Sequence, residues 1–412
     1  MIETVELSQL AKIVTGKTPP TIISEYFEGE YPFITPSDIP TFQEKILPNT
    51  ERSLSEKGKN YQKQLLIPKG SICYVAIGST IGKLCKTHNN CFTNQQLHSL
   101  IPYPDKISGD YLYYLLRTIS PYFQLVGDGK GSGKPIINKT EFSKVKIYIA
   151  HDIPTQQRIA SILSAYDDLI EVNNQRIKLL EETARELYKE WFVRLRFPGY
   201  KNAKFVKGVP EGWEIKKVND TFNVMGGGTP STEKSEYWNG NVNWFTPTDI
   251  TSSTGIFLHE SGNKITEKGL KESSSKLFPA HSIMMTSRAT IGAVGINTTS
   301  ACTNQGFITC LPNEQIPYTF LYCWIIFNKE IFEMLGTGST FLEITKGTFK
   351  QINMLVPIKN LIQKFHEMVN PMFNQVENLQ QQNTELRQIR DRLLPRLISG
   401  KLAVKEQEAM VN

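Results

Sequence analysis

The chain lacks the features that mark a membrane or secreted protein. Among its 412 residues, 40% are hydrophobic and 21% charged, and no apolar run approaches the about 20 residues that a membrane-spanning helix needs. Residues 1–6 show no basic segment followed by an apolar one, so a secretory signal is not expected. We therefore expect a cytoplasmic protein with enough apolar material for two hydrophobic cores.

Recognisable catalytic and metal-binding patterns are also missing. The six cysteines form no Cys-x-x-Cys pair, so we expect buried thiols and no metal site. No Asp/Asn-Pro-Pro-Tyr/Phe tetrapeptide of amino-methyltransferases is present, and residues 370–373 break that pattern. The glycine-rich stretch 129–134 departs from a phosphate loop, with Asp128 at the first glycine position and Pro135 at the hydroxyl position. These absences favour a binding protein over an enzyme.

Charge of either sign is not in large excess, but it is unevenly spread. The 46 basic and 40 acidic residues give a net charge of +6, which does not by itself indicate nucleic acid. Basic residues gather in two stretches, 130–146 and 194–217. Each is explained equally well by solvated surface lysines.

The chain contains an internal repeat. Residues 16–39 read GKTPPTIISEYFEGEYPFITPSDI and residues 227–250 read GGTPSTEKSEYWNGNVNWFTPTDI, with 12 of 24 positions identical at a shift of 211. At a shift of 210, Thr-Ile-Gly at 80–82 recurs at 290–292, and Thr-Asn-Gln at 93–95 recurs at 303–305. The chain therefore holds two related domains of about 150 residues, a common size for one core.

Each domain is followed by a segment whose apolar residues alternate at intervals of four and three, which is typical of a helix that packs on another helix. The first series is Ile159, Leu163, Tyr166, Ile170, Asn173, Ile177, Leu180, Ala184, Leu187 and Trp191. The second series is Phe365, Val369, Met372, Val376, Leu379, Asn383, Leu386, Arg390, Leu393 and Leu397. The two series superpose at a shift of 206, and Arg390 stands where the first has Ala184.

Such long helices cannot bury an apolar seam alone, and the obvious partner of each is its repeat. Because a globular domain separates them, an antiparallel coiled coil is the simplest closed arrangement. Asn173 and Asn383 interrupt the seams; they would either fix the register or lie at a wet edge. We predict an α+β protein of two similar mixed α/β domains joined by two long helices with pseudo-twofold symmetry. The predicted segments are 1–150 (first domain), 151–197 (first helix), 198–356 (second domain), 357–400 (second helix) and 401–412 (flexible tail).

The repeated motifs supply hydroxyl, amide and cationic groups next to expected strands, where loops emerge. Such groups suit contacts with DNA phosphates and bases, although backbone-bonding or turn-forming roles are at least as plausible for several of them. The candidate DNA contacts are Lys17, Ser37, Thr80, Lys83, Asn94, Gln95, Lys130, Ser132, Lys134, Thr248, Arg288, Thr290, Asn304, Gln305, Ser339 and Lys346. If the domains read different sequences, however, shared residues should be scaffold or phosphate contacts. We therefore expect base specificity in the dissimilar stretches near 40–65 and 251–275.

The order of these features resembles the DNA-specificity subunit of Type I restriction-modification systems. The resemblance rests on Gly-x-Thr-Pro, Trp/Phe-x-Thr-Pro-x-Asp-Ile, Thr-Ile-Gly and Pro-Glu-Gly-Trp-Glu at 210–214, in duplicated order over nearly the whole chain. It implies two target-recognition domains that each read one half of a bipartite site in double-stranded DNA, and helices that set the spacer and dock partners. It carries over no base-reading residue.

The resemblance also implies partners and a division of chemistry. Two methyltransferase (modification) subunits would use S-adenosylmethionine, restriction subunits would use ATP and Mg for translocation and cleavage, and this chain would bind no cofactor. Two other readings remain: an adaptor whose coiled coil joins protein-binding modules, and a duplicated-domain enzyme. Salt-dependent binding to duplex DNA separates the first from the specificity subunit, and methyl transfer by the chain alone would indicate the second.

Overall fold

The computed structural model describes residues 2–39, 45, 47, 49–128, 136–338 and 342–404. By its internal contacts the chain divides into two units: residues 1–172 with 383–412, and residues 173–382. Two long helices, α5 (Ile153–Tyr188) and α11 (Lys359–Ile398), each contribute one part to each unit. The helices were predicted as segments of their own, whereas by contacts each half of a helix belongs with the domain that packs on it.

In its described residues, the first unit contains three small sheets and four α-helices besides the long ones. Its strands are β1 (Ile2–Glu6), β2 (Ala11–Thr15), β3 (Phe27–Ile34), β4 (Arg52–Leu54), β5 (Ile72–Val75), β6 (Leu84–Lys86), β7 (Phe92–Thr93), β8 (Leu97–Pro102) and β9 (Lys146–Ala150). Its shorter helices are α1 (Leu7–Leu10), α2 (Glu56–Tyr61), α3 (Gly109–Asp128) and α4 (Lys139–Ser143). The sheets have the orders β1-β9, β2-β8-β5-β6 and β4-β3-β7.

The second unit repeats this arrangement with a few additions. Its strands are β10 (Phe205–Val206), β11 (Val209–Pro210), β12 (Glu214–Lys217), β13 (Asn223–Gly226), β14 (Trp238–Phe245), β15 (Phe257–Leu258), β16 (Asn263–Ile265), β17 (Ile283–Thr286), β18 (Val294–Asn297), β19 (Ala301–Thr303), β20 (Phe307–Leu311) and β21 (Asn353–Val356). Its shorter helices are α6 (Pro247–Thr251), α7 (Glu267–Lys271), α8 (Tyr318–Phe327), α9 (Lys329–Met334) and α10 (Lys346–Lys350).

The two units share one topology. The orders β12-β21, β13-β20-β17-β18 and β16-β14-β19 match those of the first unit strand for strand, and β15 adds an edge strand to the central sheet. The senses also match, since β3 pairs antiparallel with β4 and parallel with β7, while β14 pairs antiparallel with β16 and parallel with β19. The prediction of two similar mixed α/β domains is therefore confirmed.

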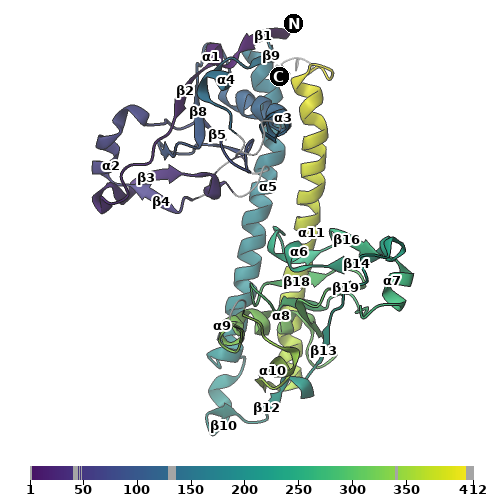
Figure 1. Cartoon of the computed structure of the whole chain (residues 1–412). Coiled ribbons are helices and arrows are strands. Elements are labelled where there is room, and N and C mark those ends of the chain that lie inside the picture. Colours follow the sequence, from purple (N-terminus) through teal and green to yellow (C-terminus); the bar gives the residue numbers. More distant parts are fainter. Residues whose placement is uncertain are drawn as a thin grey trace, which may run out of the picture. The chain divides into compact units, whose positions relative to one another are not determined.

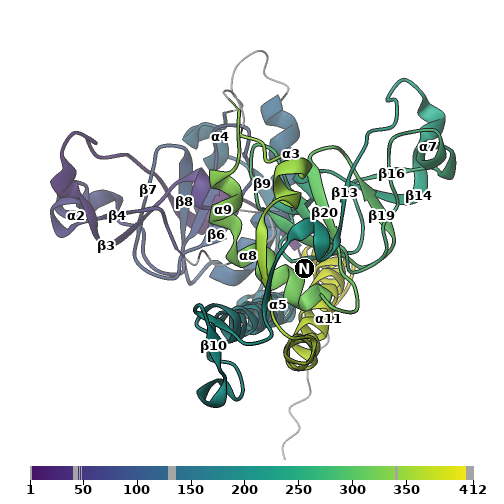
Figure 2. The same ribbon diagram turned by 90° about the horizontal axis from the view of Figure 1, so that it is seen from below.

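In each unit an apolar helix packs between the sheets of the domain and the long helices. Residues 111–116 of α3 are at most 2% exposed, and residues 318–325 of α8 are at most 8% exposed. A helix that is apolar on all sides is stable only when covered on all sides. Figure 1 shows α3 beside α5, with α2 at the far side of the first domain. In the second unit, Figures 1 and 2 show α8 beside the long helices and α7 and β14 farther away.

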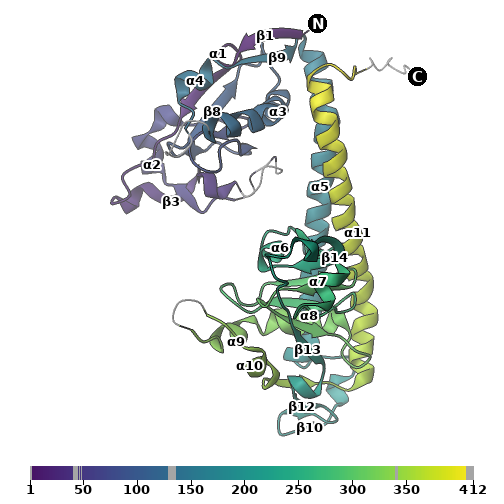
Figure 3. The same cartoon turned by 45° about the vertical axis from the view of Figure 1, so that its right-hand side comes forward.

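Within each unit the two long helices run antiparallel and share a core with the domain. In the first unit, Ile159 and Leu163 of α5 lie in one apolar cluster with Leu394 and Leu397 of α11. In the second, Ile177 and Ala184 share a cluster with residues of α11 from 361 to 379. Figure 3 shows α11 running along α5 and past α8 in the second unit.

The buried face of these helices departs from the strict alternation in the sequence. Tyr166 and Met372 are only half-buried, and their neighbours Asp167 and Phe373 take the buried positions instead. Spacings of four, four and three residues replace the heptad here because α3 and α8 also pack on the helices and widen the buried face. The remaining predicted seam residues are buried or half-buried, and Arg390, the charged residue that stands where the first series has Ala184, is 1% exposed.

Three further observations concern the cysteines, membrane-spanning helices and metal-binding groups. All six cysteines are buried free thiols, as predicted. In the part of the chain that the structure describes, no helix is long and apolar enough to cross a bilayer. In the same ranges, no group of three His, Cys, Asp or Glu side chains could hold a metal ion.

Candidate nucleic-acid interface

The repeated Gly-x-Thr-Pro motif fastens one loop of each domain onto another. In the first unit a Cβ atom on Gly16 would lie 2.2 Å from the carbonyl oxygen of Thr93, so only glycine allows this approach. The Lys17 amide donates to the same carbonyl at 3.0 Å, and the Thr18 hydroxyl donates to Oε1 of Gln95 at 2.9 Å. The loop after β2 is thus held on the loop before β8.

The second unit uses the same contacts. A Cβ on Gly227 would lie 2.0 Å from the carbonyl oxygen of Asn304, and the Gly228 amide donates to Thr303 O at 2.9 Å. The Thr229 hydroxyl donates to Oε1 of Gln305 at 2.5 Å. Because both copies use these groups for the same internal contacts, the motif is explained as scaffold.

The Thr-Pro-x-Asp motifs form capped turns. The backbone amides of Thr35 and Thr246 donate to the carboxylates of Asp38 and Asp249 at 2.7 and 2.6 Å. The other carboxylate oxygen of each aspartate accepts a backbone amide 13 residues later, at 2.8 Å in both units. Both carboxylates are therefore used to hold loops, while Ser37 and Thr248 at the turn between them are exposed.

These loops converge at one edge of the central sheet of the first unit. The Asn94 amide donates to Ile34 O at 3.1 Å, which brings the loop before β8 to the end of β3. The Ala76 amide donates to Gln96 O at 2.8 Å, and Ala76 O accepts from the Ile137 amide at 2.9 Å. Loops after β2, β3 and β5 therefore meet the loop before β8 and the segment before α4.

The second unit brings the corresponding loops together in the same way. The Asn304 amide donates to Phe245 O at 3.0 Å, the Ser287 amide donates to Gly306 O at 2.9 Å, and the Ile344 amide donates to Ser287 O at 3.0 Å. A Cβ on Gly226 would lie 3.8 Å from Nζ of Lys346, so this lysine belongs to the same edge. We call this edge of each central sheet, with its loops, the loop edge.

The loop edge presents part of the predicted DNA-contacting set. The exposed members are Lys17, Ser37, Gln95, Thr248, Arg288, Thr290, Gln305 and Lys346. Thr80 is half-buried, and Arg288 is paired with Glu343 at 2.8 Å.

Other predicted residues have structural contacts that account for them. Nζ of Lys83 donates to Ile39 O at 3.0 Å, and the side-chain oxygens of Asn94 and Asn304 accept backbone amides two residues later, at 3.0 and 2.9 Å. Lys130, Ser132, Lys134 and Ser339 lie outside the described residues.

The sequence comparison missed two features of this region. Lys139, the first residue of α4, is exposed at the position that Lys346 occupies in α10, at a shift of 207, but only Lys346 was among the predicted contacts. Ser-Glu-Lys-Gly at 55–58 recurs as Thr-Glu-Lys-Gly at 266–269, with the serine and threonine hydroxyls capping α2 and α7. Both stretches expected to carry specificity therefore contain the same structural turn. Their dissimilar parts are the residues that precede it, before 55 in the first unit and before 266 in the second.

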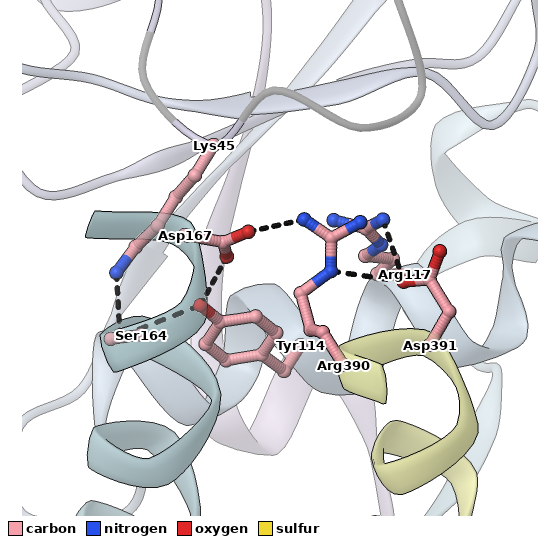
Figure 4. A network of polar contacts seen from close by, with 7 residues as sticks. All are labelled: Lys45, Tyr114, Arg117, Ser164, Asp167, Arg390 and Asp391. Atoms are coloured by element: carbon pink, nitrogen blue, oxygen red, sulfur yellow. Dashed lines mark hydrogen bonds and ion pairs between the residues drawn. The ribbon is translucent and has the colours of Figure 1, made fainter. Parts of the chain in front are cut away.

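This dissimilar part contacts the long helices in each unit. In the first unit, Nζ of Lys45 donates to the Ser164 hydroxyl of α5 at 2.7 Å (Figure 4). It also pairs with Asp110 at 3.0 Å. In the second, the Phe257 amide donates to Oε1 of Gln380 on α11 at 3.1 Å. In the stretches that differ most between the domains, Lys45 and Phe257 therefore contact the long helices directly.

One buried histidine supports the loop edge of the first unit. His98 is 3% exposed, and its ring nitrogens lie 3.1 Å from the Thr15 hydroxyl and 3.0 Å from Ile137 O. Burial lowers the pKa of His98 below its ordinary value of 6.5. The His98 ring therefore holds β2 and the segment before α4 together.

Twin α/β domains on paired long helices, each with polar loops gathered at one sheet edge, define a class of DNA-recognition protein. The family model for the Type I restriction modification DNA specificity domain matches residues 2–182 and 210–388. This chain belongs to that family.

Particular relatives match along nearly the whole chain. The Type I restriction enzyme MjaIX specificity subunit of Methanocaldococcus jannaschii is 30% identical over 97% of this chain and 93% of its own length. The HindI specificity subunit of Haemophilus influenzae is 24% identical over 83% of this chain and 88% of its own. The S subunit of a Type I restriction-modification system from M. genitalium shares the fold, with a TM-score of 0.60 at 15% identity over 98% of this chain and 97% of that one.

Proposed function

We propose that this chain is the DNA-specificity subunit of a Type I restriction-modification complex, in which each domain reads one half of a bipartite site in double-stranded DNA. The observation that carries the proposal is the loop edge, which occurs once in each domain with the same internal contacts and with exposed polar side chains. Loops held on a rigid frame are where base and phosphate contacts are made. Two half-sites joined by a stiff connection gain affinity by effective concentration only at the matching distance.

In this proposal the chemistry belongs to partner subunits. Two methyltransferase subunits dock on the long helices and transfer a methyl group from S-adenosylmethionine to a flipped adenine. Restriction subunits use ATP and Mg for translocation and cleavage. The names of the relatives, which are specificity subunits of restriction enzymes, support this division of roles.

The test is to express the chain with its methyltransferase subunits and to map methylated adenines in the host genome. We expect one motif with two specified parts and an unspecified gap. A Lys17→Ala/Gln95→Ala variant removes a cationic and an amide group from one loop edge and should weaken recognition of one part by about tenfold or more, since each group can contact a DNA phosphate or base. Arg288→Ala/Gln305→Ala should affect the other part.

Matched controls are Lys106→Ala in the first unit and Lys201→Ala in the second, since both lysines are exposed outside the loop edge. These controls should leave the motif unchanged. If both double variants change the same part, or neither part, the assignment of one half-site to each loop edge is wrong. A purified complex that shows no salt-dependent affinity for duplex DNA would indicate the adaptor function instead.

A further inference from the structure

The first unit contains an ion pair buried between the two long helices. Asp167 of α5 and Arg390 of α11 are 8% and 1% exposed, and Nη1 of Arg390 donates to Oδ1 of Asp167. The Tyr114 hydroxyl of α3 donates to the other carboxylate oxygen (Figure 4). Beside this pair, Asp391 accepts from Nε of Arg390 at 2.9 Å and from Arg117 of α3 at 3.1 Å. The domain and both helices are thus joined by charged groups at one level.

The corresponding level of the second unit is apolar. At the shift of 206 that relates the helices, Asp167 corresponds to Phe373 and Arg390 corresponds to Ala184. Both are 0% exposed and belong to the same apolar cluster, and the ring centroid of Tyr322 on α8 lies 5.3 Å from that of Phe373. The antiparallel register that joins 167 to 390 is the one that joins 184 to 373. We call these two levels the polar layer and the apolar layer.

We infer that the two layers form a pairing code, by which α5 selects α11 of its own chain over the α5 of a second copy. The related repeats make such mispairing a real competitor, because two chains could exchange helices and pair like with like. A single buried polar group at a helix seam is known to select partner and register in this way. Selectivity of this kind depends on penalising the wrong pair as well as stabilising the right one.

Exchange would separate Asp167 from Arg390, which would leave Asp167 without its counterion and Arg390 with only Asp391 of its own helix. In an α5–α5 pair, Asp167 would face Ala184, and in an α11–α11 pair, Arg390 would face Phe373. The place of Asp391 beside Arg117 would be taken by Arg185, which brings two like charges together. A buried ion that loses its partner is strongly destabilising, whereas an apolar pair in the same place is often neutral or better.

The pairing code has a consequence for DNA recognition, and this consequence rests on the proposed function. A chain whose own two halves pair keeps two different domains on one pair of helices, and so specifies two different half-sites. Exchanged helices would instead place two copies of the same domain together. The pairing code therefore preserves the asymmetry of the recognised site.

The test uses the full chain without DNA. Two differently tagged copies are mixed, unfolded in urea, refolded together and captured by one tag, and the captured fraction of the other copy is measured. The native chain should give little exchange. The Asp167→Phe/Arg390→Ala variant makes both layers apolar, and its captured fraction should rise by about tenfold or more because the penalty of orphaned charges is gone.

A second variant also removes the difference between the two layers, by substitutions in the second unit. It serves as the test if the first variant does not fold. Phe373→Asp/Ala184→Arg makes both layers polar and should also raise exchange. All four substitutions together exchange the positions of the two layers, restore the difference between them, and should return the captured fraction to the native level. A merely structural role of the ion pair predicts no such return.

Equal captured fractions for the native chain and for whichever matched variant folds would overturn the inference. So would high exchange in the four-substitution variant. Because no DNA or partner subunit is present, these outcomes do not depend on the proposed recognition of bipartite sites. Failure of that function would show instead in the methylation map.

Discussion

At the scale of a single residue, His98 makes the stability of the first unit depend on pH. Burial lowers the pKa of its ring below the ordinary value of 6.5, so the folded protein disfavours the protonated form. The folded state therefore binds fewer protons at this position than the unfolded state, so acid favours unfolding. This contribution to stability is complete above about pH 6.5 and is lost as the pH falls toward the lowered pKa.

We predict that a His98→Gln variant loses less stability between pH 7 and pH 5 than the native chain does. Glutamine has an acceptor and a donor for Thr15 and Ile137 but cannot bind a proton in this range. Urea unfolding at the two pH values measures the difference, with His88→Gln as control because His88 is exposed. His366, whose pKa burial also lowers, should leave some acid sensitivity in every variant. Equal acid sensitivity in His98→Gln and His88→Gln would contradict the assignment.

At the scale of the element, both units contain the same close contact between two loops, at Gly16 in the first and at Gly227 in the second. Gly16→Ala would place a methyl group 2.2 Å from the carbonyl oxygen of Thr93, and neither loop can yield easily because both hold the sheet edge. We predict a loss of about 1–3 kcal/mol or more in the free energy of unfolding, as for an overpacked core. Gly227→Ala should act likewise on the second unit.

The control for both substitutions is Gly109→Ala at the start of α3, where an added Cβ would lie 3.4 Å from its nearest neighbour. Urea unfolding gives the size of each effect, and limited proteolysis shows which domain opens first. Gly16→Ala should expose sites in the first domain and Gly227→Ala sites in the second. If either loses no more stability than Gly109→Ala, the glycine does not serve to allow the close approach of the loops.

Elements were predictable from the sequence where a local pattern determines them. The repeat predicted two domains of one topology, and the apolar alternation predicted two long helices that pair antiparallel. The buried position of Asp167 could not be predicted, because a charged residue next to Tyr166 looks like an exposed one. Only the structure shows that Arg390, 223 residues later, supplies its counterion. Long-range pairing of this kind leaves no local signal in the chain.

The roles of the shared motifs were only partly predictable for a related reason. Duplication indicated that Thr93 to Gln95 and Gly16 to Thr18 matter to both domains, but not what they contact. The structure explains them as a clasp between loops, and of this clasp Gln95 and Lys17 have exposed side chains. The 55–58 turn escaped notice because it lies inside stretches that otherwise differ between the domains, although its shift of 211 is that of the longest repeat.

At the scale of the whole molecule, both long helices pass from one unit to the other, α5 between residues 172 and 173 and α11 between 382 and 383. In the proposed function these helices set the gap between half-sites. Lengthening both at these points keeps the cores of the two units intact, because the clusters that join helix and domain lie on either side. The gap should then change while each half-site stays the same.

We predict that inserting seven helix-forming residues at each of the two points yields a methylated motif with unchanged halves and a longer gap. Seven residues add about 10 Å and nearly whole turns, so the buried face keeps its direction. At about 3.4 Å per base pair the gap should grow by at most about three base pairs. A chain with the insertion in α5 alone is the control, since its mismatched helices should lose stability and methylate poorly. A doubly lengthened chain that folds and methylates the original motif would show that the helices do not measure the distance along the DNA.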